Sequence, residues 1–254
     1  MKVLYTLENL TLNYGEKLIL RNLTLEIRSG LTSLIGPNGA GKTSLLRVLA
    51  GLEKYSGSVK LKNSEIKKIS RKNFARSVSF VMSEKNFRPS FSFTVREIMS
   101  LGHVGILGGR LKSHDLELIE NAAELLKISH LMSRNIMTLS DGERQLAFIA
   151  AGLARDTEII LLDEPTAALD PDKAAMVFSI LRKLADEGKS IIVAVHDINT
   201  AGFYSDFFIA LKNGVLIFDG LELNQKKLKE LYDSDFMAYH NDERNDLMWR
   251  VIAD

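Results

Sequence analysis

The chain has 254 residues, of which 46% are hydrophobic, so it is long enough to bury a sizeable core as one domain or as a domain with a lobe. Its 33 Lys and Arg residues nearly balance its 32 Asp and Glu residues, which gives no support to nucleic acid as a partner, because nucleic-acid binders usually carry a basic excess. Cysteine is absent, which excludes disulfides, thiolate metal sites and cysteine nucleophiles.

The N-terminal half of the chain predicts strands around a glycine-rich loop. Leu23, Leu25 and Ile27 show the alternation of a half-buried strand, and the helix expected after the loop stops at Gly51. The elements predicted here are strands at 3–8, 18–28, 31–35, 58–61 and 78–82 and a helix at 43–50.

From about residue 88 to 155 the pattern changes to helical spacing, which predicts a mostly helical lobe inserted into an α/β core. A strand–helix–strand rhythm then follows, as in a parallel sheet. Asn213-Gly214 is a strong hairpin signal. The elements predicted here are helices at 94–101, 113–126, 141–154 and 172–187 and strands at 159–162, 190–195, 206–211, 215–218, 236–240 and 247–252.

The purest apolar runs, 159–162 and 191–195, are far shorter than the about 20 residues of a membrane-spanning helix. The first eight residues also lack the apolar stretch of a signal peptide. We therefore expect a soluble protein that reaches a membrane only through a partner.

The first motif is Gly36-x-x-x-x-Gly41-Lys42-Thr43, which lies between a predicted strand and a predicted helix. Glycines let successive backbone N–H groups turn inward around phosphates, and the helix N-terminus adds positive potential. Lys42 would neutralise the β- and γ-phosphates, and the hydroxyl of Thr43 would ligate Mg²⁺. The alternative is an ordinary strand-to-helix turn with a surface lysine.

The second motif places two carboxylates, Asp163 and Glu164, directly after the apolar strand 159–162. Ligands of open α/β sheets bind at such strand ends. Asp163 would hold Mg²⁺ through water, and Glu164 would polarise the attacking water. Taken alone, the same residues could simply enter a turn.

The third motif, Leu139 to Gln145, opens a predicted helix. Ser140 and Glu143 form the S-x-x-E capping-box pattern, which is structural. A helix N-terminus with Ser and Gly is also an anion site, so the two interpretations coexist.

In order and spacing, these three motifs, together with Thr166-x-x-Leu169-Asp170, resemble the ATPases of the ABC-transporter family over residues 3 to 220. The resemblance implies one ABC ATPase domain over 1–254, with a P-loop NTPase core of parallel strands, an N-terminal antiparallel β-subdomain and a helical subdomain at 88–155. Residues 231–254 form a short C-terminal extension, expected as a hairpin.

The resemblance also implies a head-to-tail homodimer that sandwiches two ATP molecules with Mg²⁺. Tyr14 matches the aromatic residue that stacks on adenine, and Asp170 the residue that signals across the dimer. Lys42, Glu164 and His196 are the expected catalytic residues, and Thr43, Asp163 and Ser83 the expected metal ligands. The nucleotide-binding residues implied are Tyr14, Gly36, Pro37, Asn38, Gly39, Ala40, Gly41, Lys42, Thr43, Ser44, Ser140, Gly142 and Asp170.

Two positions depart from the family pattern. Asp141 stands where many relatives have glycine, and Ser83, followed by Glu84, stands where the family usually has the glutamine that contacts Mg²⁺ near the membrane subunits. A serine hydroxyl can approach Mg²⁺ through water but is shorter, so coupling of hydrolysis to transport is the step most affected.

Residues 94 to 103 are similar to the start of the helical lobe in importers of iron chelates, haem and vitamin B12. This similarity implies permease partners in the membrane, an indirect substrate-binding protein, and a peripheral position on the cytoplasmic face. The alternative is a soluble ABC ATPase that acts as an assembly factor, for example in iron–sulfur cluster assembly. A nucleotide-gated binding module with weak turnover is disfavoured because Lys42, Glu164 and His196 are all present.

Overall fold

The computed structural model describes residues 2–82, 92–107, 111–241 and 246–252. The chain divides into two compact units, one made of Met1–Ile69 with Ser190–Asp254 and the other of Ser70–Lys189. Ser83 and Glu84, which the sequence places near Mg²⁺ and the membrane subunits, lie outside the described residues. The single ABC ATPase domain over 1–254 and the boundaries of the 88–155 helical subdomain stay predictions.

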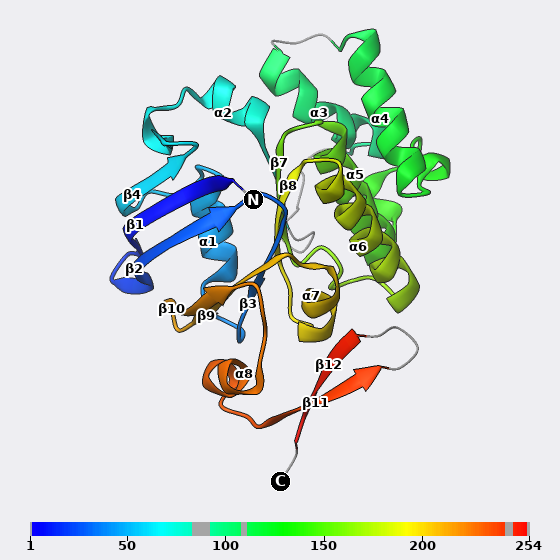
Figure 1. Cartoon of the computed structure of the whole chain (residues 1–254). Coiled ribbons are helices and arrows are strands. Elements are labelled where there is room, and N and C mark those ends of the chain that lie inside the picture. The colour runs from blue at the N-terminus through cyan, green and yellow to red at the C-terminus, as the bar shows by residue number, and fades with distance from the viewer. Residues whose placement is uncertain (1, 83–91, 108–110, 242–245, 253–254) are drawn as a thin grey trace. The chain divides into compact units, whose positions relative to one another are not determined.

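The first unit begins with an antiparallel sheet whose strands are ordered β2-β1-β4-β5 (Figure 1). Along β2 the buried residues Leu23, Leu25 and Ile27 alternate with exposed Thr24 and Glu26, as the sequence pattern predicts. The strands are β1 (Val3–Tyr14), β2 (Lys17–Arg28), β4 (Ser56–Leu61) and β5 (Ser64–Glu65).

The same unit holds a second group of strands, in the order β10-β9-β3-β8. β3 pairs in parallel with both β8 and β9, and every residue of β3 is buried. β10 pairs antiparallel with β9 across the predicted Asn213-Gly214 turn. The elements are β3 (Leu31–Ile35), α1 (Lys42–Leu49), β8 (Ser190–Ala194), β9 (Phe207–Lys212) and β10 (Val215–Gly220).

The C-terminal part of this unit contains two helices that the sequence analysis did not predict, α7 (Ile198–Tyr204) and α8 (Gln225–Tyr232). They precede β11 (Phe236–Asn241) and β12 (Asp246–Val251), which pair antiparallel as the red strands of Figure 1. The two strands expected near the C-terminus are therefore present, and they form what is called below the C-terminal hairpin.

The second unit combines two parallel strands with helices. α5 contacts α3, α4 and β6, so it lies at the centre of the helical cluster. α3 continues to Leu107, beyond the expected end at Leu101, and α2 was not predicted. The elements are α2 (Arg71–Ser77), β6 (Val78–Val81), α3 (Val95–Leu107), α4 (Ser113–Leu125), α5 (Asp141–Ala154), β7 (Ile159–Asp163) and α6 (Pro171–Asp186).

The expected fold class is confirmed: parallel strands, an antiparallel N-terminal sheet and a cluster of helices are all present. Among the described residues, no helix combines the length and the apolar character that crossing a membrane requires.

Candidate active site

The glycine-rich loop leaves the end of β3 in a conformation that requires glycine at its first position. Gly36 has a φ of 143°, and a Cβ atom built there would lie 2.0 Å from the carbonyl oxygen of Leu211. Gly39 and Gly41 also have positive φ values, 76° and 104°. The three glycines therefore allow the loop to make the tight turn that the motif predicts.

The loop ends at the N-terminus of α1, whose N-cap residue Gly41 offers no side chain to the first turn. That turn also carries no acidic residue, so neither a side-chain cap nor a negative charge competes with an anion there. Pro37 and Ser44 are half-buried, Asn38 and Thr43 are exposed, and Ala40 is buried. This helix start can therefore receive phosphate oxygens.

Lys42 is the buried cation of the loop, with 5% of its surface exposed. Its Nζ donates to the carbonyl oxygens of Gly36 at 2.7 Å and Pro37 at 3.2 Å. These bonds hold the lysine side chain against the loop, where its positive charge can attract an anion. The predicted Lys42 position is thus part of the loop and not a surface side chain.

Tyr14 lies at the end of β1 with its side chain partly exposed. Its hydroxyl donates to Oε1 of Glu53 at 3.0 Å, and the same carboxylate accepts from Nε of Arg47 in α1. The ring is therefore tethered to the helix that begins at the loop. Glu53 and Arg47 had no signal in the sequence, because only the fold brings residues 14, 47 and 53 together.

His196 is exposed and lies between β8 and α7. The next residue, Asp197, caps α7 by accepting from the backbone N–H groups of Asn199 at 3.0 Å and Thr200 at 3.2 Å. A capped helix start fixes the chain that follows the histidine. The side chain itself stays accessible, as a group that approaches a ligand must be.

In the second unit, β7 ends in the two carboxylates that the sequence predicts. Asp163 is buried, with 4% of its surface exposed, and Glu164 is half-buried. Glu164 has a φ of 49°, a left-handed conformation that is uncommon for a residue other than glycine. Such backbone conformations cluster at functional sites, so this geometry favours a chemical role for Glu164.

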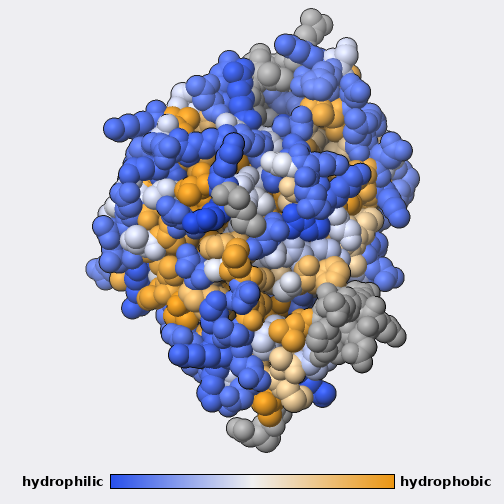
Figure 2. Space-filling model, in the orientation of Figure 1, coloured by the Kyte–Doolittle hydropathy of each residue, from blue (hydrophilic) through white to orange (hydrophobic). Residues whose placement is uncertain are grey.

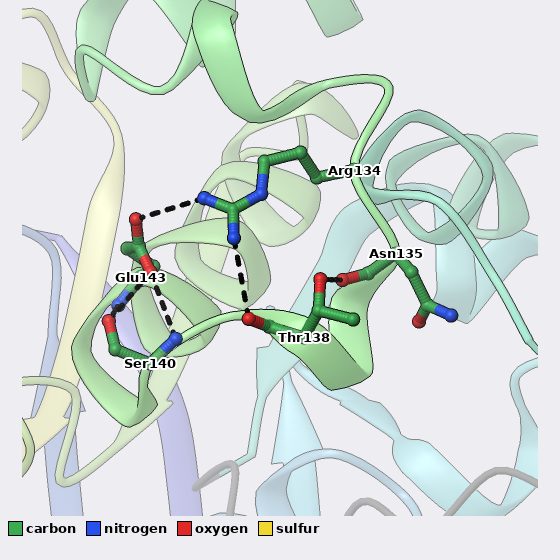
Figure 3. A network of polar contacts seen from close by, with 5 residues as sticks. All are labelled: Arg134, Asn135, Thr138, Ser140 and Glu143. Atoms are coloured by element: carbon green, nitrogen blue, oxygen red, sulfur yellow. Dashed lines mark hydrogen bonds and ion pairs between the residues drawn. The ribbon is translucent and has the colours of Figure 1, made fainter.

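Ser140 caps α5 through a reciprocal pair of bonds with Glu143, which confirms the capping-box pattern. The Ser140 N–H and Oγ both donate to Oε2 of Glu143, at 2.9 and 2.8 Å, and the Glu143 N–H donates to Ser140 Oγ at 3.3 Å. Arg134 lies over this carboxylate, 3.6 Å from Oε1, and also donates to the carbonyl oxygen of Thr138 (Figure 3). Arg134 is a supporting residue that the sequence motif did not reveal.

Gly142 lies against the turn that follows β7. A Cβ atom on it would be 3.1 Å from the carbonyl oxygen of Ala168, so a larger residue would fit only if that turn shifted by a few tenths of an ångström. Asp141, the departure from the family pattern, pairs with Arg144 on the same helix. The carboxylate of Asp141 is exposed, so its charge lies at the surface of α5, where it is paired with Arg144.

Asp170 is the N-cap of α6. Its side chain accepts from the Lys173 N–H at 2.9 Å, and the Lys173 ammonium lies 2.8 Å from Oδ2. The ammonium of Lys173, followed by its backbone N–H, holds the pKa of Asp170 below its usual value. The described contacts therefore give Asp170 a structural role in addition to the one that the resemblance implies.

The oxygen donors proposed for a metal are the hydroxyl of Thr43 and the carboxylate of Asp163. Hydroxyl and carboxylate oxygens are the ligands that Mg²⁺ prefers, and exposed Thr43 leaves room for water ligands. These residues fit Mg²⁺ by their chemistry. The third expected ligand, Ser83, is not among the described residues.

A phosphate loop, a strand that ends in two carboxylates and a capped Ser-Asp-Gly helix together define a P-loop ATPase of the ABC class. The sequence model of the family described as ABC transporter matches residues 20–167. The chain therefore belongs to the ABC transporter family, and it is a nucleotide-binding ATPase of that family.

Curated relatives cover most of the chain. It is 35% identical over 231 residues to the petrobactin import ATP-binding protein YclP of Bacillus subtilis, which covers 89% of this chain and 91% of that protein. It is 36% identical over 218 residues to the ferric enterobactin transport ATP-binding protein FepC of Escherichia coli, which covers 84% and 80% of the two chains.

Solved structures agree on the fold. The bacterial ABC transporter cassette MJ0796, solved as a dimer, has a TM-score of 0.77 at 27% identity and covers 87% of this chain and 99% of its own. An ABC transporter described as of metal-chelate type, in an inward-facing conformation, has a TM-score of 0.82 at 24% identity and covers 99% and 98%. The predicted fold is therefore confirmed by similarity as well as by its elements.

Proposed function

We propose that this chain is the ATP-binding subunit of an importer of iron chelates, haem or cobalamin, and that it drives uptake through permease subunits in the membrane. The observation that carries the ATPase step is the loop from Gly36 to Thr43, with Lys42 buried over an uncapped helix start. The importer step is supported by relatives named for import of petrobactin and transport of ferric enterobactin.

In this proposal the loop amides and Lys42 bind the phosphates of ATP, and the exposed ring of Tyr14 stacks on adenine. Thr43 and, through water, Asp163 would hold Mg²⁺, which would neutralise phosphate charge when bound. Ser83, the third expected ligand, would contact the same ion through water. Phosphoryl transfer needs mainly positioning and charge neutralisation, which these residue types supply.

Glu164 accepts a proton from the attacking water, and His196 donates a hydrogen bond to the γ-phosphate. Ser140 and Gly142 of a second copy complete the site in a head-to-tail homodimer. Because the hydroxyl of Ser140 donates to Glu143 in the structure, dimer closure exchanges this bond for one to a phosphate oxygen. Asp170 transmits the conformational change of dimer closure from one copy of the chain to the other.

The partner side of the proposal has its own test. The tagged chain is expressed together with its chromosomal neighbours. It is then purified in detergent from the membrane, at whose cytoplasmic face we expect it to lie. Co-purification of a polytopic membrane protein, and faster ATP hydrolysis when a loaded substrate-binding protein is added, are the expected results. ATPase activity with no membrane partner would instead support the soluble assembly factor.

Cargo is tested separately by uptake. Cells that lack the chain should fail to accumulate a radiolabelled ferric siderophore, haem or cobalamin, and the gene should restore accumulation. A variant with Lys42→Met is the matched control, because it keeps the protein present while removing the phosphate-binding charge. Restoration by that variant would contradict the proposal that ATP binding drives uptake.

A further inference from the structure

A cavity of about 210 Å³ lies among α2, α3, α4 and the end of α5, within the second unit, and none of the site residues assigned above lines it. This volume is below the about 300–1,000 Å³ of sites for drug-sized ligands, yet several times the about 30 Å³ share of one water molecule. Its ionisable lining residues are Arg76, His103, His114, Asp115, Arg155 and Asp156.

Arg155, the C-cap of α5, lies half-buried in the wall of this cavity. Its Nη2 donates to the carbonyl oxygen of Ala75, but its buried Nε has no hydrogen-bond partner, and no carboxylate is paired with it among the described residues. Burial lowers the pKa of Arg155. A guanidinium carries five N–H donors and stays charged in proteins. Arg155 therefore has N–H donors beside the cavity that its bond to Ala75 does not use.

Gly102 of α3 makes room for this arginine. A Cβ atom at that position would lie 3.0 Å from both Cγ and Cδ of Arg155. The arginine side chain therefore runs across a position of α3 that lacks a side chain. This explains why a helix keeps a glycine in its middle, where glycine normally costs about 1 kcal/mol.

His103 is the second buried polar group of the wall, with 6% of its surface exposed. Its Nδ1 lies 3.3 Å from Oδ1 of Asp115. The backbone N–H of Lys112, together with His103, holds the pKa of Asp115 below its usual value, so Asp115 is a carboxylate that can only accept. Nδ1 must then donate, which leaves the buried Nε2 without a partner as an acceptor when the ring is neutral.

The charges around the cavity favour an anion. Asp156 is neutralised by Lys189 at 2.7 Å, and Asp115 is engaged by Lys112 and His103. Arg76 is an exposed cation on the rim with no ion pair among the described residues. Two guanidinium groups thus face a space whose carboxylates are already occupied.

From this geometry we propose that the cavity is a binding site for a small oxyanion of the phosphate class, held by Arg76 and Arg155 with His103 as acceptor. Guanidinium groups bind such oxyanions through paired N–H donors. Hydrogen phosphate also carries an O–H that can donate to Nε2 of His103, whereas sulfate carries none. The site lies at the end of α5 opposite Ser140.

The test is calorimetric titration of inorganic phosphate into the full chain, saturated beforehand with a non-hydrolysable ATP analogue and Mg²⁺. The analogue fills the loop from Gly36 to Thr43, which is itself a phosphate site. We expect phosphate to bind with the analogue present and sulfate to bind more weakly at the same pH. Arg155→Met should raise the dissociation constant about tenfold or more.

Arg76→Met, on the exposed rim, is a second variant in which folding is not at risk, and it should weaken binding in the same direction. Arg71→Met is the matched control, since it removes a guanidinium from the same helix, α2, outside the cavity lining. The proposal is overturned if the analogue abolishes phosphate binding. It is equally overturned if Arg76→Met and folded Arg155→Met bind phosphate like the parent chain.

Discussion

At the scale of single residues, Glu164 combines a carboxylate with a backbone conformation that few residues adopt. Replacing it by glutamine keeps the size and removes the base, so ATP should still bind while turnover falls by ~10²–10⁴. Steady-state phosphate release together with nucleotide binding measures both effects. Glu158→Gln, an exposed residue just before β7, is the control and should leave turnover intact. An unchanged rate in Glu164→Gln would show that another group is the base.

Gly36 gives a second prediction at this scale. Gly36→Ala places a Cβ atom 2.0 Å from the Leu211 oxygen, so the loop must move and ATP affinity should fall sharply. Gly202→Ala in α7 is the matched control, because no atom lies within 4 Å of its added Cβ. The control should be neutral or stabilising by about 0.5–1 kcal/mol. Thermal melting and ATP titration of both variants decide between these outcomes.

At the scale of elements, the C-terminal hairpin is fastened to α7 and α8. Trp249, Phe236 and Leu228 form a small buried core, and the side-chain amide of Asn199 pairs with both backbone groups of Trp249 at 2.7 and 3.2 Å. Hydrophobic residues of the hairpin are exposed, Met237 and Leu247 among them. Figure 2 shows hydrophobic surface in orange among the hydrophilic surface in blue. The C-terminal hairpin therefore packs against α7 and α8 with one face, and its other face carries exposed side chains.

This attachment predicts the effect of truncating Trp249. Loss of a buried tryptophan typically costs about 3–5 kcal/mol, and here the loss falls on a two-stranded element that cannot persist alone. In Trp249→Ala, backbone amides of β11 and β12 should exchange with solvent faster than those of β3. Leu247→Ala, an exposed residue of the same strand, should leave exchange unchanged. Equal protection in the two variants would contradict the proposed fastening.

The capping box of α5 predicts a dependence of stability on pH. The N–H and hydroxyl of Ser140, followed by the charge of Arg134, lower the pKa of Glu143. A carboxylate with a lowered pKa stabilises the fold above its unfolded pKa of about 4.3 and loses that contribution as pH falls through the folded value. The melting-temperature advantage of the parent over Glu143→Gln should therefore shrink below about pH 5. A constant difference across that range would argue against an ionised cap.

At the scale of the whole molecule, the proposed head-to-tail dimer, with half a site in each copy, predicts assembly that depends on nucleotide. Glu164→Gln with ATP and Mg²⁺ should elute as a dimer in size-exclusion chromatography with light scattering, and as a monomer without nucleotide. Adding Ser140→Arg should prevent the dimer by placing a bulky cation at the proposed contact, while the variant still binds ATP. A dimer that forms without ATP, or that survives Ser140→Arg, would contradict the head-to-tail arrangement.

The sequence by itself determined the fold class, the phosphate loop and the capping box, because each depends on residues close together along the chain. The spacing of Gly36, Gly41 and Lys42 and the alternation along β2 are local signals, and the structure bears them out. The same holds for the family, which the order of the motifs already indicated.

Only the tertiary structure decided what distant residues do for one another. Arg134 over Glu143 and Asn199 on Trp249 join positions that no local pattern connects. The sequence pattern predicts that this helix ends at Leu101, yet α3 continues to Leu107, and Arg155 packs over Gly102 within it. Contacts between residues far apart in the sequence, which propensity does not encode, therefore decided the lining of the cavity beside α3.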